Sequence, residues 1–149
     1  MTTRARIELR RTLKAPIERV FAAFEDPGLV AMWLRPAPDV TLHVLALEFR
    51  EGGAYRFAYV VPDGTRMVVG GRYLRIDPPR RIEFSWLIEP PDEHAGIESE
   101  VTVLLEPNAD ATELVIRHER WDRADAQARH AAGWQGALDL LAAQLEDGG

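Results

Sequence analysis

The side chains of this sequence that could carry out acid–base chemistry are few. Four histidines are spread over the chain, and one of them, His118, follows Leu114 and Ile116 at every second position. This period of two predicts a strand with His118 on its inward face. We expect a neutral, hydrogen-bonded histidine inside the protein, because burial disfavours the charged form. A ligand contact or a proton carrier is the alternative role for His118.

Large aromatic side chains are the second group of candidates. A buried indole or phenol needs a partner for its N–H or O–H group, so these residues favour cavity walls that have a polar end. Packing in an ordinary core is the alternative for each aromatic residue. The predicted ligand-binding residues are Trp33, Phe57, Tyr59, Met67, Trp86, His118 and Trp134.

Two neighbours of Trp134 could also matter. His130 lies one helical turn before Trp134, and we expect it to end the apolar stripe at solvent, with the mouth of a cavity as the alternative. Gly133 lies inside the same helical pattern, where glycine costs about 1 kcal/mol relative to alanine. We expect a close approach of the helix to the sheet at Gly133; space for a ligand beside the indole is the other interpretation.

Several kinds of chemistry lack their usual residues. The chain has no cysteine, no His-x-x-x-His pair and no glycine-rich phosphate-binding fingerprint. Its two serines, Ser85 and Ser99, do not lie in a Gly-x-Ser-x-Gly motif. The inward faces of the predicted strands carry few carboxylates, which gives a two-carboxylate mechanism no clear basis. We therefore expect no metal, no cofactor and no catalytic residue of these types.

The charge and the hydrophobic pattern of the sequence limit the kinds of partner that the protein is expected to bind. The net charge of −6 makes nucleic acid and anionic lipid poor partners, because phosphate binding needs a basic field. No stretch reaches the ~18 apolar residues of a membrane-spanning helix. The N-terminus also lacks the apolar core of a signal peptide. We expect a cytoplasmic protein that binds a hydrophobic small molecule, without nucleic acid or membrane partners; a homodimer remains open.

The elements that must position these residues follow from periodicity. Apolar alternation predicts a strand near residues 5–13, and a period of 3.6 then predicts two short helices within residues 17–34. Six strands at hairpin spacing are expected between residues 40 and 118. A long amphipathic helix should begin near Asp122 and end near Leu145. The predicted fold is a single α+β domain over residues 1–149, with an antiparallel sheet covered by that helix.

An ordered set of residues along the whole chain matches a known family. The set comprises Ala15-Pro16 with Val20-Phe21, Trp33, Gly52-Gly53 with Tyr55 and Phe57, Pro62-Asp63-Gly64, Gly71 and Tyr73, Asp77-Pro78-Pro79, Phe84 and Trp86, Val101-Thr102-Val103, Thr112 with His118-Glu119, and Gly133-Trp134 with Leu138 and Leu141. In this set the chain resembles the homologues of the activator of the heat-shock-protein-90 ATPase, in the START-like helix-grip (SRPBCC) superfamily. The resemblance implies the order β-αα-ββββββ-α, a curved antiparallel sheet wrapped around the C-terminal helix, and a cavity between them.

The sequence thus predicts a binding protein for an apolar or aromatic small molecule. Two alternatives remain open. One is a cyclase- or dehydratase-type enzyme that uses the same cavity, with His118 and a tyrosine moving protons. The other is a protein-binding, chaperone-related module that acts through its surface or a sheet edge.

Overall fold

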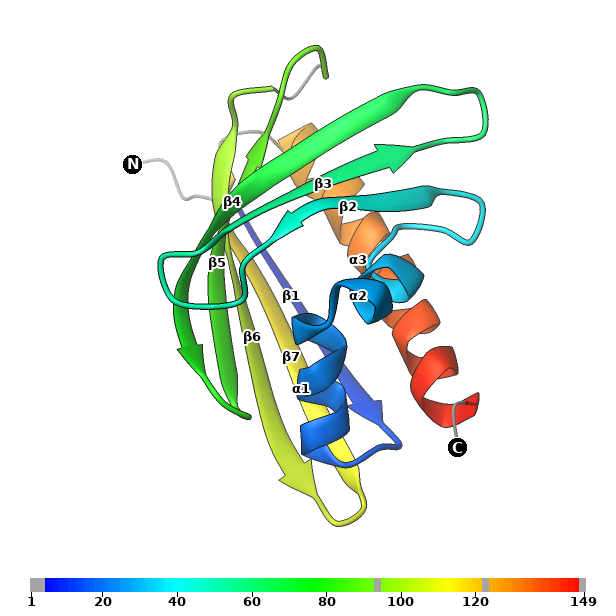
Figure 1. The fold of residues 1–149 in the computed structure, drawn as a ribbon, viewed down its shortest axis with the longest axis vertical. Coiled ribbons are helices and arrows are strands. Elements are labelled where there is room, and N and C mark those ends of the chain that lie inside the picture. Colours follow the sequence, from blue (N-terminus) through cyan, green and yellow to red (C-terminus); the bar gives the residue numbers. More distant parts are fainter. Residues whose placement is uncertain (1–4, 93–94, 122–123, 148–149) are drawn as a thin grey trace.

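The computed structural model describes residues 5–92, 95–121 and 124–147, which form a seven-stranded sheet and three helices (Figure 1). In chain order the elements are β1 (Ala5–Leu13), α1 (Ile17–Glu25), α2 (Pro27–Trp33), β2 (Thr41–Leu47), β3 (Ala54–Val60), β4 (Arg66–Asp77), β5 (Arg81–Ile88), β6 (Glu98–Asn108), β7 (Ala111–Trp121) and α3 (Ala124–Asp147). This order confirms the predicted β-αα-ββββββ-α arrangement. The predicted capping residue of the long helix, Asp122, lies outside the described residues.

The sheet is antiparallel throughout and open at both edges. Its spatial order is β1-β7-β6-β5-β4-β3-β2, so each strand from β2 to β6 pairs with the next one in sequence. The first strand, β1, pairs with the last, β7. Helices α1 and α2 connect the two edge strands, β1 and β2. The two short helices therefore span the distance between the two edges of the open sheet.

The sheet curves, and α3 lies on its concave side (Figure 1). Strand pairing shifts register between Val44 and Ala46 of β2 and between Tyr73 and Arg75 of β4. Such irregularities bend strands and increase their twist. Figure 1 shows β2, β3 and β4 arching over one end of α3, whereas β1 and β7 run to one side of it. The predicted sheet around a long helix is confirmed.

The start of α2 differs from the sequence-based expectation. Within residues 17–34, the turn-forming residues Asp26-Pro27-Gly28 predict a break between the two short helices, with the second beginning near Leu29. Instead α2 begins at Pro27. The Asp26 carboxylate accepts hydrogen bonds from the backbone N–H groups of Gly28 and Leu29, at 2.8 and 3.2 Å. Proline suits the first helical position, because its missing N–H has no helical partner there, and an aspartate cap satisfies the next donors.

Helix α3 is held by the apolar stripe that the sequence predicts. Every member of that stripe is buried: His130, Trp134, Ala137, Leu138, Leu141 and Leu145. Burial of such a stripe, rather than intrinsic propensity, stabilises most protein helices. Among the helices of the described ranges, none is both long enough and apolar enough to cross a membrane.

Candidate functional site: a cavity between sheet and helix

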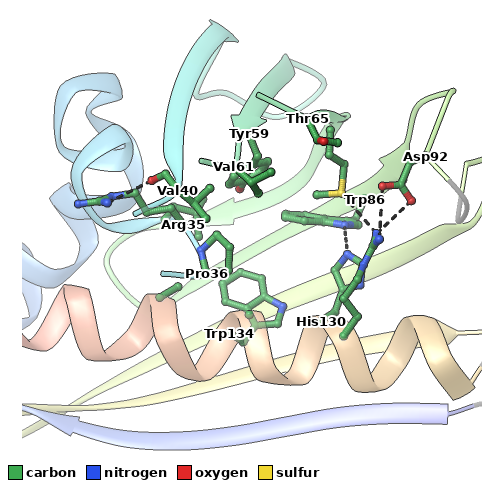
Figure 2. A pocket seen from close by; sticks show the side chains of 15 residues that line it. Arg35, Pro36, Val40, Tyr59, Val61, Thr65, Trp86, Asp92, His130 and Trp134 are labelled. Carbon is green, nitrogen blue, oxygen red and sulfur yellow. Dashed lines mark hydrogen bonds and ion pairs between the residues drawn. The ribbon is translucent and has the colours of Figure 1, made fainter. Parts of the chain in front are cut away.

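A cavity of about 300 Å³ lies between α3 and the part of the sheet formed by β3, β4 and β5 (Figure 2). Its walls come from β3, β4, β5, the loop after α2 and one face of α3. Figure 2 shows Tyr59 and Val61 opposite Pro36 and Trp134, with Trp86 and His130 toward the end where Asp92 lies. The full lining is Leu34, Arg35, Pro36, Val40, Tyr59, Val61, Thr65, Met67, Trp86, Asp92, Arg129, His130, Gly133, Trp134 and Ala137.

The loop between α2 and β2 forms one wall because a single arginine gathers its carbonyl groups. The Arg35 guanidinium donates hydrogen bonds to the carbonyl oxygens of Met32, Pro38 and Val40, at 3.1, 2.6 and 3.1 Å. These bonds neutralise much of the loop's backbone polarity. The loop is also pressed against α3, since a Cβ atom at Gly136 would overlap the backbone carbonyl of Pro36. Glycine at position 136 thus allows the loop to approach the helix.

The Trp134 indole at the cavity wall is fixed by His118 behind it. The indole Nε1–H of Trp134 donates to His118 Nδ1 at 2.9 Å. An indole N–H can only donate, so Nδ1 must be the unprotonated nitrogen and the proton lies on Nε2. The Nε2 atom lies 2.7 Å from the Ser99 hydroxyl oxygen. The serine hydroxyl in turn donates to the Trp86 carbonyl at 3.4 Å.

A second pair repeats this arrangement at Trp86. The Trp86 Nε1–H donates to His130 Nε2 at 3.2 Å, and His130 Nδ1 lies 2.9 Å from the Ala126 carbonyl oxygen, to which it donates. The rings of His118 and His130 are 5.8 Å apart. Burial lowers the pKa of His118 well below its usual value, and the nearby His130 lowers it further. We call Trp86, Ser99, His118, His130 and Trp134 the indole–imidazole cluster.

An ion pair lies at the far end of the cavity. Arg129 of α3 donates to both carboxylate oxygens of Asp92, at 3.2 and 3.3 Å. The same guanidinium approaches the Met67 sulfur at 3.3 Å. The pair ties the segment after β5 to α3 beside Trp86 (Figure 2). Within residues 5–92, 95–121 and 124–147, no group of three or more His, Asp or Glu side chains is arranged to hold a metal ion.

Four of the seven predicted ligand-binding residues line the cavity: Tyr59, Met67, Trp86 and Trp134. His118 does not, because Trp134 stands in front of it. Trp33 is fully buried under α1, where its Nε1–H donates to the Ala23 carbonyl at 2.9 Å. Phe57 borders a separate hollow of only about 10 Å³. The structure therefore places Trp33, Phe57 and His118 outside the cavity lining.

Two expectations about α3 are wrong. His130 does not end the stripe at solvent: it is 6% exposed, lines the cavity and accepts the Trp86 hydrogen bond. Strand β5 covers it, which the helix pattern alone does not reveal. Gly133 does not mark a close approach to the sheet, because a Cβ there would meet only the Pro36 Cβ at an ordinary 3.5 Å. The close approach is at Gly136, and it is to the loop.

Sequence reasoning also missed Ser99 and the Arg129–Asp92 pair. Ser99 carried a usable signal, since it precedes Val101, Val103 and Leu105 at intervals of two and shares their buried face. The hydroxyl of Ser99 acts there as a hydrogen-bonding group between His118 and the Trp86 carbonyl, not as a nucleophile in a Gly-x-Ser-x-Gly motif. The Arg129–Asp92 pair joins residues far apart in the chain, and no local pattern identifies such a contact.

The fold defines the class of this protein. A curved antiparallel sheet that holds a long C-terminal helix, with two short helices between its first two strands, is a helix-grip fold. The family model of the Activator of Hsp90 ATPase homolog 1-like protein matches residues 14–146, so the chain belongs to that family. This membership confirms the resemblance seen in the sequence.

Solved structures agree with that assignment. A protein of Chromobacterium violaceum is 34% identical, with a TM-score of 0.85 over 95% of this chain and 97% of its own. The AHSA1 protein of Silicibacter pomeroyi is 26% identical, with a TM-score of 0.86 over 97% and 100% of the two chains. A protein of Rhodobacter sphaeroides, 26% identical, has a TM-score of 0.80 over 95% and 92%. A comparison with curated proteins gives no match.

Proposed function

We propose that the protein binds a compact apolar or aromatic small molecule in the cavity between the sheet and α3. The observation that carries this proposal is the cavity itself, about 300 Å³ in volume and walled mainly by Trp86, Trp134, Pro36 and aliphatic side chains. Ligand pockets of proteins range over about 300–1,000 Å³ and are lined mostly by apolar groups. The volume at the lower end of this range favours a compact ligand over a long acyl chain.

The indole–imidazole cluster supports binding over acid–base catalysis. Each nitrogen of His118 and His130 is engaged inside the protein, by Trp134, Ser99, Trp86 and the Ala126 carbonyl. A general base must reach the proton that it abstracts. A cyclase-type reaction would require one of these imidazoles to leave its partner first. As the protein stands, the histidines hold the indoles that form the walls.

A cavity-filling variant tests the proposal. A leucine in place of Gly133 has room for its Cβ atom and would extend into the cavity beside Trp134. Ala143→Leu is the matched control, because Ala143 is exposed on the same helix. Titration calorimetry with ethylnaphthalene should detect binding by the parent protein and by Ala143→Leu, and none by Gly133→Leu. Native mass spectrometry of the purified protein would identify a co-purified ligand.

Two results would argue against the proposal. Failure of the parent protein to bind ethylnaphthalene or any other compact aromatic compound would remove its basis. Unchanged binding by a folded Gly133→Leu variant would place the ligand elsewhere. Turnover of a polyketide-like substrate that is lost in His118→Gln, with binding retained, would favour the cyclase-type alternative instead.

A further inference from the structure

The polar groups around the cavity differ in whether the protein already uses them. The indole N–H groups of Trp86 and Trp134 are donated to histidines. The Arg35 guanidinium is bonded to backbone carbonyls, and Arg129 is paired with Asp92. These residues present to the cavity mainly carbon faces, or charges that are already neutralised.

The Tyr59 hydroxyl is the exception. Tyr59 is 6% exposed and lines the cavity, and its hydroxyl makes no hydrogen bond to the residues that the structure describes; it is not among the fully enclosed polar atoms without a partner, so it is open to the cavity. By contrast, the buried hydroxyl of Tyr55 donates to the Ser85 carbonyl at 2.6 Å. Thr65, the other hydroxyl residue of the lining, is exposed and can be hydrated. Figure 2 shows Tyr59 extending from the sheet toward the space above Pro36 and Trp134.

An unused hydroxyl in such a place points to an occupant. Buried polar side-chain atoms are hydrogen-bonded in the large majority of cases, and buried tyrosine hydroxyls usually find a partner. Because the hydroxyl is open to the cavity, a water molecule or a ligand held there is its partner, and a ligand that displaces the water keeps the hydrogen bond only if it offers an acceptor. Burial raises the pKa of Tyr59, so the hydroxyl keeps its proton and can donate it.

The polar side chains of the cavity lining also indicate that the bound ligand is uncharged. A buried anion is costly unless a cation pairs with it. Both arginines of the lining, Arg35 and Arg129, already have partners in the protein. The indole rings of Trp86 and Trp134, with centroids 5.9 Å apart and planes inclined at 46°, provide flat apolar surfaces for a ring.

We propose, on the basis of the ligand-binding function above, that the cavity selects an uncharged, compact aromatic molecule with one carbonyl-type oxygen that accepts a hydrogen bond from Tyr59. The aromatic part lies against Trp86 and Trp134. The single oxygen sets its orientation.

Three probes of similar size test this selection by titration calorimetry. Acetylnaphthalene carries the acceptor, ethylnaphthalene lacks it, and naphthoate adds a negative charge. A neutral hydrogen bond contributes modestly, so the parent protein should bind acetylnaphthalene about three- to tenfold more tightly than ethylnaphthalene. Naphthoate should bind more weakly than acetylnaphthalene. In Tyr59→Phe the preference for acetylnaphthalene should disappear, with ethylnaphthalene binding retained.

Tyr55→Phe is the matched control, because it removes a hydroxyl outside this cavity. It should keep the preference for acetylnaphthalene, even if it is less stable. Equal binding of acetylnaphthalene and ethylnaphthalene by the parent protein would overturn the role of Tyr59, as would a preference that survives in Tyr59→Phe. Naphthoate binding as tight as acetylnaphthalene binding would overturn the requirement for an uncharged ligand. If no probe binds at all, the proposed function itself fails.

Discussion

The concave face of the sheet carries two aromatic regions that are built from similar residues and packed differently. In the closed region, Tyr55, Phe57, Tyr73 and Phe84 border a hollow of only about 10 Å³, and Trp33 of α2 is packed into the cover of this region. In the open region, Tyr59, Trp86 and Trp134 border about 300 Å³. On the strands the two regions follow one another at intervals of two: Phe57 and Tyr59 lie two positions apart on β3, and Phe84 and Trp86 lie two positions apart on β5.

What covers each region explains the difference. The closed region lies under α1 and α2, whose aromatic residues interlock with it; Phe24 and Trp33 meet edge to face with ring centroids 4.9 Å apart. The open region lies under α3 and the Pro36 loop, where Gly133 contributes no side chain. The tryptophans differ as well. Trp33 bonds to a backbone carbonyl, whereas Trp86 and Trp134 bond to histidines. Aromatic content alone therefore does not distinguish a core from a cavity.

The largest expected effect is in the closed region. Trp33→Ala should lower the free energy of unfolding by ~3–5 kcal/mol, the usual range for deleting a large aromatic side chain from a packed core. Urea denaturation measures this loss. Binding of ethylnaphthalene by the folded fraction should be unchanged, because Trp33 lies outside the cavity lining. A weaker affinity in this variant would mean that the two regions are coupled.

Trp134→Ala should cost less than Trp33→Ala, below ~3 kcal/mol, because one face of the Trp134 indole already borders empty space. The same change should weaken ethylnaphthalene binding strongly. Trp134→Phe is the control: it keeps a ring in the wall but removes the hydrogen bond to His118. A loss of ~3 kcal/mol or more in Trp134→Ala, with ligand binding intact, would assign Trp134 to the core.

The fold followed from local patterns, whereas the difference between the two regions did not. Alternation along β3, β5 and β7, and the stripe on α3, predicted which faces are buried. The inward, hydrogen-bonded position of His118 was predicted in the same way and is confirmed. These patterns report burial, and burial is the same for a residue in a core and for one at an enclosed cavity wall.

The features that the sequence did not predict depend on contacts between segments that are far apart in the chain. Trp33 was expected at the cavity because tryptophans favour walls, but it packs under α1, a contact between helices that no periodicity encodes. His130 looked like the end of a stripe because its cover, Trp86, comes from another element. The Pro36 loop reaches α3 only because residue 136 is glycine. A pattern read along one element cannot reveal what lies across from it.

His118 should make stability depend on pH in a defined window. Its pKa in the folded protein lies below the ~6.5 of an unfolded histidine, so below that pH the unfolded chain binds a proton that the folded protein does not. The contribution of His118 to the free energy of unfolding is fully present above pH ~6.5. It is lost as the pH falls, at a rate of up to ~1.4 kcal/mol per pH unit. Urea denaturation between about pH 7 and pH 5 measures this slope.

His118→Gln should flatten that slope, because glutamine can accept from Trp134 and donate to Ser99 without titrating. His43→Gln controls for the loss of a histidine as such, since His43 is exposed on β2. His130 belongs to the same cluster, so the double variant His118→Gln/His130→Gln would test whether any slope that remains after His118→Gln depends on its neighbour. An unchanged slope in His118→Gln would show that His118 is not the titrating group.

The smallest effect tests the space beside Trp134 directly. Gly133→Ala should raise the free energy of unfolding by up to ~1 kcal/mol, because alanine favours a helix interior over glycine and its Cβ meets Pro36 only at an ordinary distance. Gly136→Ala, one turn further along α3, gains the same helix propensity but places its Cβ against the Pro36 carbonyl, so it should be destabilising. Thermal and urea unfolding of the two variants show whether each change in the free energy of unfolding is positive or negative.

Stabilisation of both variants would mean that the Pro36 loop moves easily, and the open region would then owe its volume to a movable wall. Destabilisation of both would mean that α3 is too close to the loop at Gly133 for any side chain, and the space assigned to a ligand beside the indole would not exist.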